Sequence, residues 1–247
     1  MMKNKRYKKR WRFLLLKILW TLSGGAQSVF SKTREIKKDE DRNGVFEQRV
    51  VYQGDRLARL DVDEDQDGRI ELRQFYQAGL LSKVERDTDG DGLMDCSDIF
   101  EKEKRIRQER LGPDGNVAAL TRFDGDGHPL ATDRDTTGNG QFDTFLIYRD
   151  GQLAHVKKDT TASGRINVWT DYFGNIPACE RRDMDEDGTI ERKVSFNTKG
   201  EPEKVEQDGN ADGRFDSTTW YSRSLPVKKE SDLNYDGKMD RFFEMDA

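Results

Sequence analysis

The chain has 247 residues, of which 33% are hydrophobic and 37% charged, and its formal net charge is -5. So low a hydrophobic fraction argues against a large dry core, while an aromatic content of 10% argues against a plain disordered tail. Something other than apolar burial is therefore expected to help hold the fold, and bound metal is the obvious candidate.

Charge is distributed unevenly along the chain. Residues 1–26 hold eight Lys and Arg and no acidic residue, which leaves 35 basic and 48 acidic residues in the remainder, a net charge of -13. Such a surface repels nucleic acid and anionic lipid and attracts cations. We therefore expect no nucleic-acid partner and a protein that binds cations.

The N-terminus has the three parts of a secretory signal peptide. A basic segment, residues 1–12, precedes the apolar run 13–22, and small residues follow up to Ala26. The run is too short to cross a hydrocarbon layer of ~30 Å, and Lys17 interrupts it, which leaves an uncleaved anchor or a surface helix as alternatives. The sequence predicts a signal peptide over residues 1–26, export to the periplasm, cell surface or medium, and no stable membrane span beyond the signal. Residues 27–38 are polar and are expected to be a linker.

From residue 39 the sequence repeats with a fixed period, which defines a repeat domain over residues 39–247. Each well-kept repeat begins with an Asp, and the spacings between these starts are 24, 24, 48, 24, 24, 25 and 24 residues. The spacing of 48 hides a decayed copy that begins near Leu111, so the domain has nine units. The starting residues are Asp39, Asp63, Asp87, Asp135, Asp159, Asp183, Asp208 and Asp232.

Each unit starts with a loop in which oxygen-bearing side chains stand at the first, third, fifth and ninth positions, with glycine at the sixth. Oxygen atoms packed this closely favour a hard divalent cation, and calcium tolerates a flexible cage better than magnesium does. Two loops have lost central carboxylates, at Thr137 and at Thr161 and Ser163, and are expected to bind weakly or not at all. The residues expected to ligate Ca²⁺ are Asp39, Asp41, Asn43, Glu47, Asp63, Asp65, Asp67, Glu71, Asp87, Asp89, Asp91, Asp95, Asp135, Asn139, Asp143, Asp183, Asp185, Asp187, Glu191, Asp208, Asn210, Asp212, Asp216, Asp232, Asn234, Asp236 and Asp240.

Between the loops, the pattern has period two, as in Ile190, Arg192, Val194 and Phe196, and this predicts strands. A glycine-containing turn and a second, more polar strand complete each unit. The phase assigns Asp124-Gly-Asp-Gly127 to this second turn and not to a metal loop. The expected fold is all-β, an antiparallel meander of about nine 24-residue hairpins in an open or rolled sheet; because two units add up to roughly one propeller blade, a β-propeller is the alternative.

The loops resemble the DxDxDGxxD calcium loops that lie between β-strands in integrin α-chain propellers. The resemblance covers residues 39–240 at the level of the motif, and it implies calcium coordination at the matching positions. A helical EF-hand needs a bidentate Glu at the twelfth loop position, where this chain has residues such as Val50, Gln74 and Leu146. Dockerins have two copies flanked by helices, and type 3 thrombospondin repeats are cysteine-rich, whereas this chain has only Cys96 and Cys179.

The sequence therefore predicts a calcium-binding exported repeat protein that acts as a structural, adhesion or binding module and is not an enzyme. Ser/His/Asp, GxSxG, phosphate-loop and HExxH signatures are missing from the sequence, and His128 and His155 are expected to be exposed. The partners would be calcium and a cell-surface glycan or protein. Two alternatives stay open: a carbohydrate-binding surface built on Trp169 and Trp220, and a carboxylate-pair glycoside hydrolase.

Overall fold

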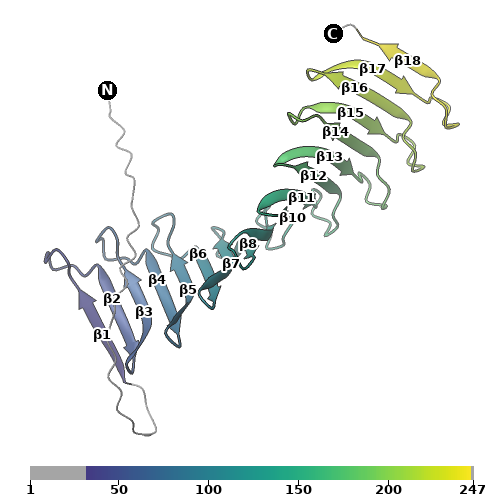
Figure 1. The fold of residues 1–247 in the computed structure, drawn as a ribbon. Helices are drawn as coiled ribbons and strands as arrows, with labels where there is room; N and C mark the ends of the chain where they lie inside the picture. The colour runs from purple at the N-terminus through teal and green to yellow at the C-terminus, as the bar shows by residue number, and fades with distance from the viewer. Residues whose placement is uncertain (1–31, 246–247) are drawn as a thin grey trace, which may run out of the picture. The chain divides into compact units, whose positions relative to one another are not determined.

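The computed structural model describes residues 32–245, and these form one antiparallel β-sheet of eighteen strands in chain order (Figure 1). Each strand pairs with the next one along the chain, from the first hairpin to the last. The strands are β1 (Thr33–Lys38), β2 (Gln48–Gln53), β3 (Arg56–Val62), β4 (Leu72–Gln77), β5 (Leu80–Arg86), β6 (Cys96–Glu101), β7 (Lys104–Leu111), β8 (Val117–Phe123), β9 (Pro129–Arg134), β10 (Thr144–Arg149), β11 (Gln152–Lys158), β12 (Val168–Phe173), β13 (Ile176–Arg182), β14 (Arg192–Phe196), β15 (Pro202–Gln207), β16 (Ser217–Ser222), β17 (Leu225–Ser231) and β18 (Arg241–Glu244).

The sheet confirms the predicted meander of hairpins and shows that the propeller alternative is wrong. Strands of one unit pair directly with strands of the next, as when Asp61 of β3 stands opposite Arg73 of β4. A propeller would instead interrupt the pairing between blades. The sheet is open, because β1 pairs only with β2 and β18 only with β17 among the described strands.

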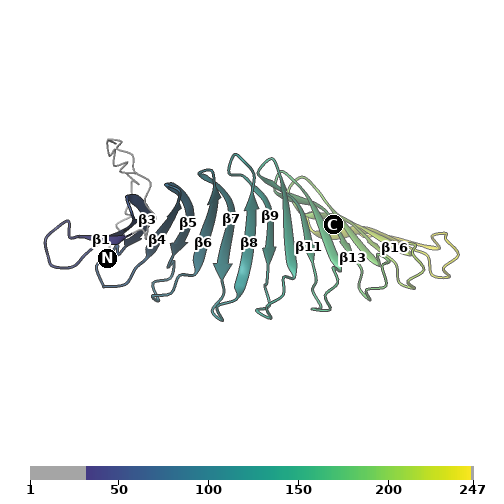
Figure 2. The same ribbon diagram turned by 90° about the horizontal axis from the view of Figure 1, so that it is seen from below.

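The two sides of the sheet carry different connections, because antiparallel strands turn back alternately at each end. The longer loops follow the odd-numbered strands, except for the short connection after β7, and lie along one edge, whereas the hairpin turns follow the even-numbered strands along the other (Figure 2). All nine repeat starts therefore come to one edge of the sheet. We call this the loop edge.

The first strand lies in a segment that was expected to be a linker. Residues 33–38 form β1, which pairs with β2 over its full length, from Thr33 opposite Gln53 to Lys38 opposite Gln48. Its side chains are all exposed, because it is an edge strand with one neighbour. This exposure explains why its polar composition resembles that of a linker. The predicted signal peptide and the rest of the linker lie outside the described residues.

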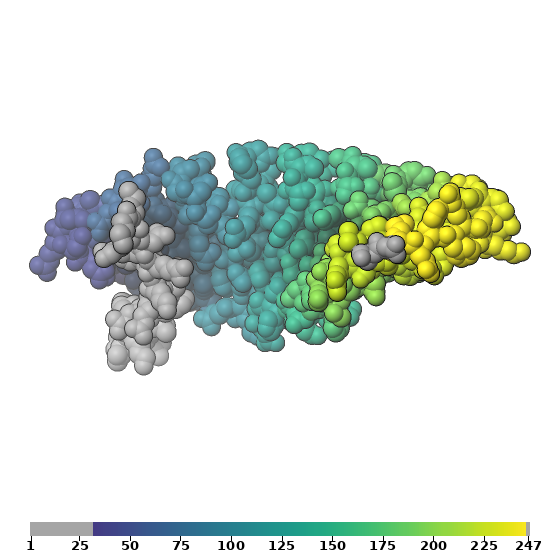
Figure 3. All heavy atoms as spheres, turned by 90° about the horizontal axis from the view of Figure 1, so that it is seen from above, coloured from purple at the N-terminus to yellow at the C-terminus, as the bar shows by residue number. Residues whose placement is uncertain are grey.

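The buried apolar side chains of the sheet are few and small. Val84, Val156, Val194 and Val205 have at most 7% exposure, and the alternation of each strand puts them on one face, which we call face A. Trp169 and its neighbours in the register stand on the opposite face, face B, as the period-two pattern predicted. Consecutive hairpins lie side by side in chain order, as the gradual colour change in Figure 3 shows.

Charged networks across neighbouring strands stabilise face B. Asp61 is only 1% exposed, and its carboxylate lies 3.0 Å from Arg73 Nε, 3.1 Å from Arg59 Nε and 3.5 Å from Arg49 Nε. These cations come from β2, β3 and β4, so one carboxylate ties three adjacent strands together. This network supplies part of the stabilisation that the few small buried apolar side chains cannot provide.

No helix in residues 32–245 has the length and hydropathy needed to cross a membrane.

Candidate metal centres

The loops along the loop edge share one backbone design. In the loop 183–191, Asp183 Oδ2 accepts the N–H of Gly188 at 3.0 Å, and the equivalent bond in the loop 63–71 joins Asp63 to Gly68 at 2.9 Å. The sixth-position glycine has φ 99° at Gly188, in the left-handed region that glycine adopts without strain. In these two loops the first Asp therefore closes the turn with one oxygen, and its other oxygen accepts no hydrogen bond.

The fourth loop position is also left-handed, a feature that the sequence analysis did not identify. Gln66 and Glu186 both have φ 65° there. Residues as different as Arg42, Ala211 and Tyr235 hold the same conformation in other loops, so residue type gives no signal. The only signal in the sequence was the pair of acidic residues at the third and fifth positions. Their side chains can converge only if the chain turns sharply at the fourth position between them.

The ninth residue has a backbone role as well as the predicted ligand role. Glu191 Oε2 accepts the N–H of Met184 at 2.5 Å, which ties the end of the loop to its beginning. Asn167 does the same with the N–H of Thr160 at 2.9 Å in a loop that has lost its central carboxylates. The acid at this position is therefore not diagnostic of metal by itself, because an amide oxygen can close the loop equally well.

Two loops bring all four predicted carboxylates together. One oxygen from each of Asp63, Asp65, Asp67 and Glu71 lies within 4.8 Å of the others, and Asp183, Asp185, Asp187 and Glu191 form an equivalent group. We call these the two complete clusters. Groups of carboxylates this close could hold a metal ion, because a cation offsets the repulsion between them.

Unpartnered buried oxygens distinguish the complete clusters from the other loops. Asp63 Oδ1, Asp183 Oδ1 and Glu191 Oε1 are buried and accept no hydrogen bond from the protein, although their residues are only 3%, 4% and 8% exposed. A buried carboxylate oxygen without a donor is costly, and a bound cation would satisfy it. The residues present therefore fit a metal ion.

The remaining loops assemble their predicted ligands only in part. Three-carboxylate groups form in the loops 39–47, 87–95 and 208–216. The groups are Asp39 with Asp41 and Glu47, Asp87 with Asp89 and Asp91, and Asp208 with Asp212 and Asp216. Asn43 and Asn210 stand at predicted ligand positions in two of these loops and hydrogen-bond to Asp41 and Asp212, respectively.

In these partial loops the first Asp uses both oxygens for the backbone. Asp87 Oδ1 accepts the N–H of Gly90 and Oδ2 that of Gly92, both at 2.7 Å. Asp208 is engaged in the same way by Ala211 and Gly213. The carboxylates of Asp87 and Asp208 are thus less available to a cation than those of Asp63 and Asp183.

Several predicted ligands lie outside every carboxylate group found in the described part of the chain. Asp95 is taken up by the N–H and hydroxyl of Thr88, and Asp143 by Thr136 and Thr144. The others are Asp135, Asn139, Asp232, Asn234, Asp236 and Asp240, in the loops 135–143 and 232–240. In both loops the starting Asp is engaged by backbone amides through both oxygens, as when Asp232 accepts from Tyr235 and Gly237.

Two pairs of adjacent loops contact each other through the fourth position, which the sequence did not reveal. Gln66 Nε2 donates to Asp41 Oδ2 of the preceding loop at 3.2 Å. In the same way Glu186 accepts from the hydroxyl of Thr161, the residue that replaces a central carboxylate in the loop 159–167. In these two places the structure joins loops that lie 24 residues apart in the sequence.

The decoy motif lies where the phase of the repeat put it. Asp124-Gly-Asp-Gly127 forms the turn between β8 and β9, on the edge opposite the metal loops. Asp124 Oδ1 accepts the N–H of Asp126 and of His128, both at 2.9 Å, so its carboxylate closes the turn. The decayed unit at Leu111 likewise keeps only a short turn, in which Gly115 N–H donates to Gly112 O.

The pKa of a carboxyl group is shifted in opposite directions in a complete cluster and in a partial loop. Burial raises the pKa of Glu71, and the negative charges of Asp65 and Asp63 raise it further, against hydrogen bonds from backbone amides that lower it. The opposite holds in the partial loop at Asp87, where burial acts to raise the pKa but the amides of Gly92 and Gly90 outweigh it and lower it. Hydrogen bonds from the backbone thus outweigh burial at Asp87, whereas burial and the neighbouring carboxylates outweigh them at Glu71.

Comparisons with known proteins do not assign a family. No protein-family model and no curated protein matches the chain. Among solved structures it is similar to a mutant of S. aureus TarM in complex with Fondaparinux, alpha-GlcNAc-glycerol and UDP, with 11% identity and a TM-score of 0.31 over 49% of this chain and 21% of that chain. It is also similar to accessory secretory protein 1, 2 and 3 of Streptococcus pneumoniae, with 12% identity and a TM-score of 0.28 over 46% and 19%, respectively.

A porin-like protein from Bacteroides uniformis is similar over 86% of this chain and 94% of its own, with 10% identity and a TM-score of 0.23. The chain spans about a fifth of the length of the first two structures. All three TM-scores are below 0.5, so these likenesses carry no argument about function. The loops themselves are the evidence that a function can be built on.

Proposed function

We propose that this protein is a calcium-binding repeat protein, in which metal ions in the loop edge stiffen a single sheet that serves as an exported structural, adhesion or binding module without catalytic activity. The observation that carries the proposal is the set of buried, unpartnered oxygens in the complete clusters, Asp63 Oδ1, Asp183 Oδ1 and Glu191 Oε1. These carboxylate oxygens are suitable ligands for a cation, and no donor of the protein forms a hydrogen bond to them.

The donor chemistry favours calcium over other divalent ions. Every clustered donor is a carboxylate oxygen, and neither histidine nor cysteine takes part in any group within the described residues. This excludes the nitrogen and sulfur ligands that zinc prefers. The third and fifth positions, such as Asp185 and Asp187, are exposed and adaptable, which suits the irregular shell of calcium better than the strict octahedron of magnesium.

Metal binding would act on stability hairpin by hairpin. Asp183 follows β13 directly and Glu191 precedes β14, and the backbone joins them through Glu191 N–H to Arg182 O at 3.1 Å. A cation held by both residues therefore ties the end of one strand to the start of the next. Sites of this type suit extracellular calcium when their dissociation constants are ~10⁻⁴ to 10⁻³ M, which agrees with the export that the N-terminal sequence predicts.

Titration of the full chain tests the proposal. Isothermal calorimetry with Ca²⁺ should show saturable heat that Mg²⁺ at the same concentration does not reproduce, and the thermal midpoint followed by circular dichroism should rise with Ca²⁺ and fall with chelator. The double variant Asp63→Asn with Asp183→Asn should lose the tightest part of the binding curve. Absence of heat, or a melting curve that is indifferent to both calcium and chelator, would overturn the proposal.

A further inference from the structure

A regular row of cations crosses face A beside the loop edge. Five consecutive units have a basic residue immediately before the loop start, and these residues are spaced by 24 along the chain: Arg86, Arg110, Arg134, Lys158 and Arg182. They stand on β5, β7, β9, β11 and β13, and we call them the basic row. The remaining units have neutral residues here, apart from the exposed Lys38 at the sheet edge.

The strand register puts the whole basic row in one line across the sheet. Arg110 stands opposite Ala119, which stands opposite Arg134, and Thr144 stands opposite both Arg134 and Lys158. The row continues outward through Cys96 to Arg86 and through Val168 to Arg182. Small side chains thus separate the cations, and with strands ~4.8 Å apart the charges recur every ~9.6 Å.

The three central cations of the row differ from the two at its ends. Arg86 is tied to Asp98 at 2.5 Å and Arg182 to Glu180 at 2.7 Å. The side chains of Arg110, Arg134 and Lys158 are exposed, and within residues 32–245 no side-chain hydrogen bond, ion pair or ring contact engages them. These three positive charges are therefore available to a ligand.

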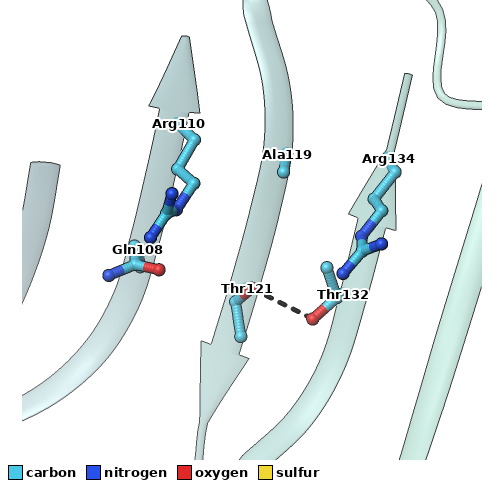
Figure 4. A pocket seen from close by; sticks show the side chains of 6 residues that line it. All are labelled: Gln108, Arg110, Ala119, Thr121, Thr132 and Arg134. Atoms are coloured by element: carbon cyan, nitrogen blue, oxygen red, sulfur yellow. Dashed lines mark hydrogen bonds between the residues drawn. The ribbon is translucent and has the colours of Figure 1, made fainter. Parts of the chain in front are cut away.

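The surface between the central cations is hollowed and polar. A hollow of about 330 Å³ is lined by Gln108, Arg110, Ala119, Thr121, Thr132 and Arg134. Figure 4 shows Arg110 and Arg134 on either side of Ala119, with Thr121 and Thr132 joined by a hydrogen bond of 3.0 Å below them. The small residues leave room for a chain to lie across the strands between the two guanidinium groups.

This part of face A carries no acidic side chain in its two central rows. From β7 to β12 the rows alternate cations with small, hydroxyl and aliphatic residues: Gln108, Arg110, Ala119, Thr121, Thr132, Arg134, Thr144, Leu146, Val156, Lys158, Val168 and Thr170. The loops beside these strands hold fewer carboxylates than the others: 111–119 has only Asp114, 135–143 has Asp135 and Asp143, and 159–167 has only Asp159. The negative charge of the repeat domain is thus weakest where the cations lack partners.

We propose that face A from β7 to β12 binds a linear anionic glycan, with Arg110, Arg134 and Lys158 each pairing with a carboxylate or sulfate group carried on about every second sugar. The cations are ~9.6 Å apart, which suits a chain of sparse charge, whereas a nucleic-acid strand carries a phosphate every ~3.4 Å and would bring excess negative charge against the acidic loop edge. The threonine hydroxyls and Gln108 match the hydroxyl groups of sugars. This inference goes beyond metal binding and does not depend on it.

The test is binding of the full chain to hyaluronan fragments, which carry one carboxylate per disaccharide, measured by fluorescence anisotropy in calcium-containing buffer. A sulfated glycan with one sulfate per disaccharide tests the other anion, and dextran and single-stranded DNA complete the panel. The triple variant Arg110→Gln, Arg134→Gln and Lys158→Gln should lose binding to an anionic glycan by roughly tenfold or more, because three exposed charge pairs are removed together.

The matched control removes three charges elsewhere. Lys157 and Arg149 stand on face B and Lys102 in a hairpin turn, all exposed, so changing these three to Gln gives the same net charge without touching the basic row. The control should bind as the unmodified chain does. Equal loss in both variants, lack of binding to either anionic glycan, or tighter binding of the DNA would overturn the proposal.

Discussion

Asp183 and Glu191 lie at the two ends of one candidate metal loop and have matching roles: in each, one oxygen accepts a backbone N–H and the other is buried and without a partner. The amide bonds fix the loop whether or not a cation is present. If the proposed cation binds here, the two remaining oxygens, Asp183 Oδ1 and Glu191 Oε1, would be a preorganised pair of ligands rather than a site that must be assembled on binding.

Asp183→Asn should weaken calcium binding at its own loop by at least about tenfold, or ~1.4 kcal/mol, because the amide can still cap Gly188 but no longer brings the negative charge. An amide-resolved NMR titration measures this site alone, since the Gly188 N–H bonds to the substituted side chain. Gly68 reports the other complete cluster in the same sample and should titrate as before. A loss of both sites together would contradict the local behaviour expected of a repeat array.

Calcium binding at the loop 63–71 should weaken as the pH falls through the raised pKa of Glu71. The raised pKa means that the metal-free folded state holds a proton on this carboxyl at a higher pH than an ordinary glutamate would, and that proton must leave before the oxygen can ligate. By the same linkage, the stabilisation of the metal-free fold by this proton is lost as the pH rises through that pKa. Following Gly68 during calcium titrations at neutral and mildly acid pH measures the effect, and a pH-independent affinity would contradict it.

The turn at Asp124 should contribute nothing to calcium binding. Asp126→Ala removes one carboxylate of the DGDG motif. The hydrogen bonds by which Asp124 caps the turn remain, because they come from the backbone N–H groups of residues 126 and 128. We expect the calorimetric stoichiometry to stay the same, whereas Asp185→Ala, a change of the same chemistry in a complete cluster, should reduce it by one site. A lower stoichiometry for Asp126→Ala would mean that the phase of the repeat does not separate sites from turns.

Gly188→Ala should destabilise its hairpin with or without calcium. Gly188 has φ 99°, and although no atom would crowd the new Cβ, the left-handed conformation itself costs ~1–2 kcal/mol for an L side chain. Gly125→Ala is the control, because that glycine does not need the left-handed region and its new Cβ would meet only the flexible end of Lys104. Thermal unfolding in chelator compares the two variants, and equal midpoints would show that the loop adapts.

The fold was predictable because the repeat fixes it at two levels. A spacing of 24 gives the phase of the loops, and the period of two in residues such as Ile190, Arg192 and Val194 gives the faces, so strand count, loop edge and the decoy turn all follow. The exception was β1, whose polar sequence is normal for an edge strand but equally normal for a linker.

The sequence predicted which residues make up the candidate sites, but not which of their carboxylate oxygens accept hydrogen bonds from the backbone. The sequence does not show that Asp63 Oδ1 accepts no hydrogen bond while both oxygens of Asp87 accept one, from Gly90 and Gly92, since both loops begin with the same residue. The difference depends on backbone orientation, which motif spacing does not encode. The basic row was also hidden, because Arg110 and Arg134 come together only through the register of three strands.

The Asp61 network should contribute more to stability than any single surface ion pair of the sheet. Asp61→Asn leaves Arg49, Arg59 and Arg73 without their common counter-ion, and we expect a loss of about 2–3 kcal/mol, below the ~3–5 kcal/mol of a fully buried pair because the arginines are partly exposed. Asp133→Asn on the same face removes a carboxylate that has only Arg122 as partner, at 2.9 Å, and should cost under ~1 kcal/mol. Hydrogen exchange of the β2, β3 and β4 amides measures the effect where it arises, because hairpins in an array open locally. If Asp61→Asn and Asp133→Asn weaken protection equally, the three-cation network would have no special part in holding the sheet, and the small apolar set of face A would have to account for its stability alone.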